Sequence, residues 1–87
     1  MERSPIMLDV EMTKKDPTYW DGQTDAGKRV VINYRLWRVR IEIDDRLIVM
    51  VPVPKDHPGT DLTSMSNLGL KQALMLYTPP GWFVLPF

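Results

Sequence analysis

The feature that most constrains this chain is a two-residue period of apolar and polar side chains that runs through residues 30–43. This period is typical of strands, because successive side chains of a strand point to opposite faces of a sheet. The period changes phase once, between an apolar set Val30, Ile32, Tyr34 and Leu36 and an apolar set Trp37, Val39, Ile41 and Ile43. A slip of one residue at Leu36 and Trp37 indicates a β-bulge within one long strand.

The residues on either side of this strand predict three further strands and a helix. Asp44 and Asp45 predict a hairpin turn, after which residues 47–53 form a returning strand that is apolar on both faces. Residues 6–12 alternate as a strand does, and residues 82–87 form a short final strand and tail. Ser66 predicts the start of a helix over residues 66–77, which prolines 79 and 80 stop. Residues 14–28 are polar and rich in turn dipeptides, so they predict a long loop.

These elements predict one α+β domain over residues 1–87, with a small antiparallel sheet of about four strands and one C-terminal helix packed on one face. Eighty-seven residues suffice for one domain but not for two. A chain of this length buries roughly 60% of the surface that its unfolded form exposes, so we expect a thin core. Eight prolines against five glycines favour short strands and stiff connections.

The chain contains no cysteine, which excludes a disulfide scaffold and a thiolate metal cluster. Residues 1–12 carry charges throughout and lack the unbroken apolar stretch of a signal peptide. The longest apolar run, residues 47–53, is far shorter than a bilayer crossing requires. We therefore expect a cytoplasmic protein without a membrane partner, found in the host cytoplasm or the virion if it is viral.

No arrangement of residues predicts catalysis. His57, the one histidine, lies near Asp56, Asp61 and Ser64 in the sequence, but these residues lack the strand–elbow–helix context of a catalytic triad. A metal site there lacks a further strong ligand. The glycines are scattered and form no phosphate-binding loop. We expect a solvated loop histidine, no metal, no cofactor and no enzymatic activity.

Residues 28–40 carry the most distinctive charge pattern, with five basic residues and no acidic one: Lys28, Arg29, Arg35, Arg38 and Arg40. Three interpretations remain open. The arginines form a solvated face that pairs with Glu42 and Asp44, they bind an acidic protein, or they bind single-stranded nucleic acid with the help of interleaved aromatic residues. The strand period places the aromatic residues with the core set, which weighs against nucleic acid.

Aromatic and apolar residues outside the basic segment predict a second type of contact. Tyr19 and Trp20 form an aromatic pair in the polar loop, either as interface anchors or as lids over a small core. One helix covers only one face of a sheet, so apolar residues on the other face need a second cover, which would be the 14–28 loop, a second copy of the chain or a different protein. These residues are Ile48, Met50, Phe83, Leu85 and Phe87.

The leading expectation is a non-enzymatic protein-binding module, such as an inhibitor, an adaptor or an accessory subunit, that occupies a partner's surface. A phage-encoded accessory protein would fit this size and charge mosaic. The first alternative is a structural subunit of a homo-oligomeric or viral assembly, and the second is a single-stranded nucleic-acid binder that uses residues 28–40. The predicted partner-binding residues are Tyr19, Trp20, Arg35, Arg38, Arg40, Phe83, Leu85 and Phe87.

Overall fold

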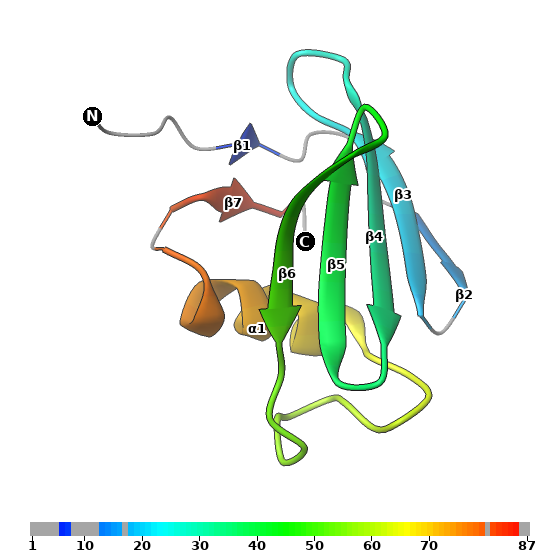
Figure 1. Ribbon diagram of the computed structural model, residues 1–87, viewed down its shortest axis with the longest axis vertical. Helices are drawn as coiled ribbons and strands as arrows, with labels where there is room; N and C mark the ends of the chain where they lie inside the picture. Colours follow the sequence, from blue (N-terminus) through cyan, green and yellow to red (C-terminus); the bar gives the residue numbers. More distant parts are fainter. Residues whose placement is uncertain (1–5, 8–12, 17, 80, 86–87) are drawn as a thin grey trace.

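A computed structural model describes residues 6–7, 13–16, 18–79 and 81–85 of the chain. In order, the elements are β1 (Ile6–Met7), β2 (Thr13–Asp16), β3 (Tyr19–Gln23), β4 (Arg29–Arg35), β5 (Arg38–Ile43), β6 (Arg46–Pro52), α1 (Asn67–Tyr77) and β7 (Phe83–Val84). Strands β2 to β6 form one antiparallel sheet in which each strand lies beside its neighbours in the chain. β1 pairs with β7 in a separate parallel ribbon (Figure 1).

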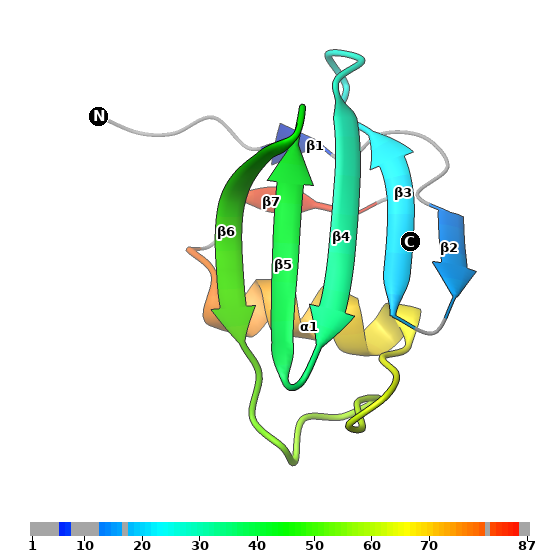
Figure 2. The same ribbon diagram turned by 45° about the vertical axis from the view of Figure 1, so that its right-hand side comes forward.

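The sheet and the helix form two layers. Figure 2 shows α1 and the β1–β7 ribbon on the same side of the five-stranded sheet, and none of the described elements crosses the other side. We call the side toward α1 the inner face and the opposite side the outer face. The predicted α+β class, with an antiparallel sheet and one C-terminal helix on one face, is confirmed.

Apolar side chains from the sheet and from α1 meet at the inner face. Every second residue of β4 and β5 is buried there: Val30, Ile32 and Tyr34 from β4, and Val39, Ile41 and Ile43 from β5. α1 contributes Leu70, Ala73 and Leu74, whose spacing places them on one side of a helix. The two strand sets of opposite phase therefore face one core, as predicted, although Leu36 is exposed.

Leu36 and Trp37 form a two-residue hairpin turn between β4 and β5, so the predicted bulge at this point is wrong. Both residues have positive φ, 50° and 65°, as the central residues of a type I′ turn do. Because the turn has two residues, Tyr34 pairs with Val39, and the inward-facing residues change from even-numbered positions in β4 to odd-numbered positions in β5. A bulge would produce the same change. At positions 36 and 37 the sequence has neither the Asn nor the Gly that usually marks such a turn. The phase change is the one sign of the turn in the sequence.

The predicted hairpin turn at Asp44 and Asp45 is confirmed, with φ values of 50° and 63°. Aspartate tolerates this left-handed region because its short polar side chain can hydrogen-bond locally. A bulge does occur in the β5–β6 ladder, where the register shifts between Ile41 and Glu42. The extra residue on β6 is Ile48, which packs against the core.

Residues 14–28 are not a loop, which corrects the prediction. β2 and β3 occupy most of this segment and pair with each other, and β3 pairs with β4. Thr24 closes the turn after β3, because its N–H donates to the Lys28 carbonyl at 2.9 Å. Short polar strands between turn residues lack the apolar alternation that reveals a buried strand. The described part of the segment extends the sheet and leaves the outer face uncovered.

The strands predicted at the two ends of the chain fall partly on described residues. The strand predicted over residues 6–12 appears as β1, and residues 8–12 lie outside the described residues. The strand predicted over residues 82–87 appears as β7, and Phe87 also lies outside the described residues. The parallel pairing joins Ile6 to Phe83 and Met7 to Val84.

α1 begins and ends where the sequence predicts. Ser66 is the N-cap, and its Oγ accepts a hydrogen bond from the Gly69 N–H at 2.9 Å. The helix stops before Thr78, which donates to the Leu74 carbonyl through both its N–H and its Oγ1. A Cβ at Gly69 would lie 3.0 Å from the carbonyl oxygens of Pro58 and Gly59. The lack of a side chain at Gly69 therefore allows the helix and the loop before it to pack closely.

Candidate functional site

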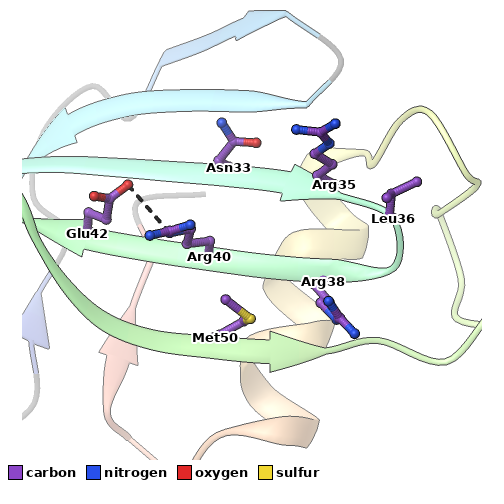
Figure 3. A pocket seen from close by; sticks show the side chains of 7 residues that line it. All are labelled: Asn33, Arg35, Leu36, Arg38, Arg40, Glu42 and Met50. Carbon is purple, nitrogen blue, oxygen red and sulfur yellow. Dashed lines mark ion pairs between the residues drawn. The ribbon is translucent and has the colours of Figure 1, made fainter.

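The outer face of the sheet carries a hollow of about 400 Å³. It is lined by Asn33 and Arg35 of β4, Leu36 of the turn, Arg38, Arg40 and Glu42 of β5, and Met50 of β6 (Figure 3). The strand residues among these lie between the buried positions and so point to the outer face. The structure thus brings together the three arginines that the sequence analysis singled out.

The charges in this hollow are unevenly compensated. Arg40 Nε lies 3.8 Å from Glu42 Oε2, and this partly exposed pair contributes little to stability. Arg35 and Arg38 are directly opposite each other in the β4–β5 ladder, where like charges repel. Among the described residues, neither has a carboxylate within ion-pair distance. The hairpin tip therefore carries positive charge without a counter-charge in the described part of the chain.

The other two bases of segment 28–40 lie away from the hollow. Lys28 is exposed in the connection between β3 and β4, and Arg29 Nε lies 3.7 Å from Asp21 Oδ1. The turn at Leu36 folds the basic segment back on itself. The segment therefore forms a compact cluster of three arginines instead of a continuous basic track along one strand.

Tyr19 and Trp20, predicted as a partner-binding pair, point to opposite faces because they are neighbours in a strand. Trp20 is 0% exposed, and its Nε1–H donates to Asn67 Oδ1 at 2.9 Å. It is a core residue, which corrects its assignment to an interface. Tyr19 is half-buried and pairs with Asn33, so it lies on the outer face near the hollow.

Phe83 and Leu85 are half-buried and pack against the core. The prediction that they lie on the second face of the sheet and need a further cover is wrong, because β7 lies on the same side of the sheet as α1 (Figure 2). Ile48 also packs against the core. Of the described members of that predicted apolar set, Met50 is the one on the outer face, and it is 45% exposed.

The exposed apolar side chains that the sequence analysis missed lie on α1. Leu68, Met75 and Leu76 are 60%, 67% and 64% exposed. Near them, a second hollow of about 220 Å³ is lined by Lys71, Leu74, Met75, Phe83, Val84 and Leu85. The sequence does contain a sign of this exposed surface. Residues 68, 75 and 76 recur at helical spacing and form a second apolar stripe, on a different side of the helix from the buried leucines.

His57 is buried, so the prediction of a solvated histidine is wrong. Its Nε2–H donates to the Gly69 carbonyl at 2.9 Å, because a carbonyl oxygen can only accept. Nδ1 then lies 3.5 Å from the Tyr77 hydroxyl, and the two rings pack edge to face. Both ring nitrogens therefore face α1, and the residue docks its loop onto the helix.

Asp61 and Ser64 also organise this loop. The Asp61 carboxylate accepts hydrogen bonds from the Thr63 N–H at 2.7 Å and from Ser64 Oγ at 2.9 Å, and these bonds lower the pKa of Asp61. Tyr34 Oη donates to the Asp61 carbonyl at 2.6 Å, and burial raises the pKa of the Tyr34 phenol. These contacts tie the loop to the sheet and leave His57 directed at the helix instead of at Asp61 or Ser64.

Within the described part of the chain, no group of three or more histidine, cysteine, aspartate or glutamate residues is arranged to hold a metal ion. No helix in that part is both long and apolar enough to cross a membrane. Comparison with known protein families, with curated proteins and with solved structures finds no match. A functional assignment therefore depends on the geometry and charge of the outer-face hollow.

Proposed function

We propose that this protein is a non-enzymatic protein-binding module, an inhibitor, adaptor or accessory subunit, that binds an acidic surface of another protein with the outer face of its sheet. The observation that carries the proposal is the opposed pair Arg35 and Arg38, which has no carboxylate partner among the described residues. A bound carboxylate would remove their repulsion. The planar fork of arginine suits this role because it binds carboxylates through two parallel hydrogen bonds.

The shape of the basic cluster favours a protein partner over a nucleic acid. Proteins that bind single strands combine a basic groove that follows the backbone with aromatic side chains that stack on bases. Here the basic residues form a short cluster at one hairpin. Tyr19 is the one aromatic residue on the outer face among the side chains that the structure describes. Glu42 and Asp21 on the same face would also repel phosphates.

The non-enzymatic part of the proposal is supported by the contacts of the residues that could do acid–base chemistry. His57 uses its ring nitrogens to dock the loop onto α1, and the Asp61 carboxylate accepts hydrogen bonds from its own loop. The absence of cysteine from the sequence fits a role in a reducing compartment such as the cytoplasm.

Replacing Arg35, Arg38 and Arg40 together by glutamate is expected to weaken partner binding by roughly tenfold or more, because it reverses the charge of the contact surface. Folding should change little, since exposed substitutions usually shift stability by under about 0.5 kcal/mol each. The immobilised chain and its variant are incubated at low ionic strength with an extract of the cells that encode it, and the recovered proteins are quantified. The matched control replaces the exposed Lys28, Lys55 and Lys71 by glutamate, which changes the net charge equally outside the hollow.

One stoichiometric acidic partner, retained by the wild type and the lysine control but lost by the arginine variant, is the expected result. Equal recovery of that partner by the arginine variant would contradict the proposal. Retention on single-stranded DNA that is lost at modest salt would favour the nucleic-acid binder instead.

A structural subunit of a homo-oligomeric or viral assembly is the second candidate, and the exposed apolar residues of α1 favour it. Leu68, Met75 and Leu76 project from a helix that has one charged residue, Lys71. Soluble monomers rarely expose large contiguous apolar patches. Packing of two copies through this surface would remove the three side chains from water.

For this second candidate, replacing Leu68, Met75 and Leu76 by glutamine is expected to convert an assembly into a monomer of 10.1 kDa, because it removes the apolar contact. Size exclusion coupled to light scattering measures the mass. The control replaces Leu47 and Leu62, two exposed leucines outside α1, and should keep the wild-type mass. A wild-type mass of 10.1 kDa at every concentration would exclude self-assembly.

A further inference from the structure

We infer that Leu36 is the apolar contact residue of the outer-face hollow, and that the partner segment bound there carries an apolar side chain next to its carboxylates. This inference rests on the proposed function and specifies the chemistry of the partner, a segment of another protein that is both acidic and apolar. Leu36 is 58% exposed and lines the hollow together with Arg35 and Arg38 (Figure 3).

The backbone at Leu36 has a conformation that leucine rarely adopts. Leu36 and Trp37 both lie in the left-handed region, with φ values of 50° and 65°. Glycine, asparagine and aspartate are preferred there, because a larger side chain crowds the neighbouring carbonyl. The turn at Asp44 and Asp45 uses a favoured residue type. The geometry of the turn therefore does not explain an exposed leucine, and such outliers cluster at functional sites.

Trp37 holds the turn in this conformation. Its side chain packs against the core, and its carbonyl accepts a hydrogen bond from the Val53 N–H at 2.8 Å. Because these contacts anchor Trp37, the hairpin presents Leu36 at its tip in a defined position. The two turn residues thus divide their roles, since Trp37 stabilises the fold while Leu36 lines the hollow on the outer face.

The surroundings of Leu36 select the chemistry of the partner. Arg35 precedes it in the chain, Arg38 faces Arg35 across the ladder, and Met50 adds exposed apolar surface in the same hollow. Carboxylates would bind the two guanidinium groups, while an adjacent apolar side chain would contact Leu36 and Met50. The phosphates of a nucleic acid would satisfy the arginines but leave the leucine in water. An acidic and apolar protein segment matches both halves of the site.

Two synthetic peptides test this inference on the full chain. One is a short glycine–serine peptide with a leucine between two glutamates, and the other has serine in place of that leucine. Their affinities are measured by NMR titration at low ionic strength. The wild type is expected to bind the leucine peptide about fivefold more tightly. Leu36→Asn is expected to reduce this preference clearly, with Met50 left as the remaining apolar contact. The variant should keep or raise the melting temperature, because asparagine tolerates the left-handed region.

Leu62→Asn is the matched control, since Leu62 is an exposed leucine outside the hollow, and it should keep the wild-type preference. Equal affinity of the wild type for both peptides, or an unchanged preference in Leu36→Asn, would overturn the role of Leu36 while leaving the acidic-partner proposal in place. A lower melting temperature of Leu36→Asn would also overturn it, because Leu36 would then serve the fold. Binding of both peptides that does not respond to Arg35→Glu and Arg38→Glu would refute the proposed function itself.

Discussion

Alanine at Trp20 is expected to lower the free energy of unfolding by about 3–5 kcal/mol, as truncation of a buried tryptophan does. Trp20 is fully buried, and its Nε1–H donates to Asn67 Oδ1 at the first residue of α1. The substitution opens a cavity between the sheet and the helix and removes their hydrogen bond. A domain of this length has roughly 4–13 kcal/mol of stability, so the loss should bring the protein close to unfolding. Urea denaturation followed by far-UV circular dichroism measures the change.

Two variants separate the contributions of Trp20. Trp20→Phe keeps most of the apolar volume but removes the donor to Asn67, and it should cost about 1–2 kcal/mol. Tyr19→Ala removes the neighbouring aromatic side chain, which lies on the outer face, and it should cost clearly less than Trp20→Ala. An unchanged free energy of unfolding in Trp20→Ala would contradict the burial of Trp20 between the sheet and α1.

Alanine at Gly59 is expected to lower the free energy of unfolding by about 2–3 kcal/mol. Gly59 has a φ of 71°, which costs any other residue about 1 kcal/mol or more. A Cβ at this position would also overlap Ser66 Oγ, the group that caps α1. Loss of an N-cap contributes about 1 kcal/mol to the penalty. Urea denaturation of the full chain measures the sum.

Gly27→Ala is the matched control for Gly59→Ala. Gly27 has a similar φ of 80°, but a Cβ there would meet no atom within 4 Å. This variant should therefore show the backbone cost alone, about 1 kcal/mol. Equal losses in the two variants would show that the approach of Gly59 to Ser66 contributes nothing to stability.

The elements that could be predicted are those whose signals lie within a few residues of one another. Alternation identified the inward residues of β4 and β5, and Asp44 and Asp45 identified a turn. Ser66 marked the start of α1 because an N-cap acts on a backbone N–H only three residues away. The arginine cluster followed from the same alternation, since residues between buried positions must point outward.

The missed features depend on contacts between distant parts of the chain. Trp20 is buried because Asn67 and the helix lie over it, and nothing near Trp20 in the sequence distinguishes it from Tyr19. His57 is buried because Gly69 and Tyr77 lie on the facing side of α1. Leu36 and Trp37 adopt the left-handed backbone of a turn, which leucine and tryptophan disfavour. Two distant contacts stabilise this turn: Trp37 packs against the core, and its carbonyl accepts a hydrogen bond from the Val53 N–H.

By itself, the sequence determined which residues share a face of each strand and helix, because side-chain direction follows from the backbone period of each element. It also determined where the helix begins and where the acidic hairpin turns, through local hydrogen bonding. Only the tertiary structure decided which faces are covered, because burial depends on the elements that pack over a residue and not on its neighbours in the chain. For this reason α1 and β7 cover the inner face of the sheet, while Leu36 and the three arginines are exposed on the outer face.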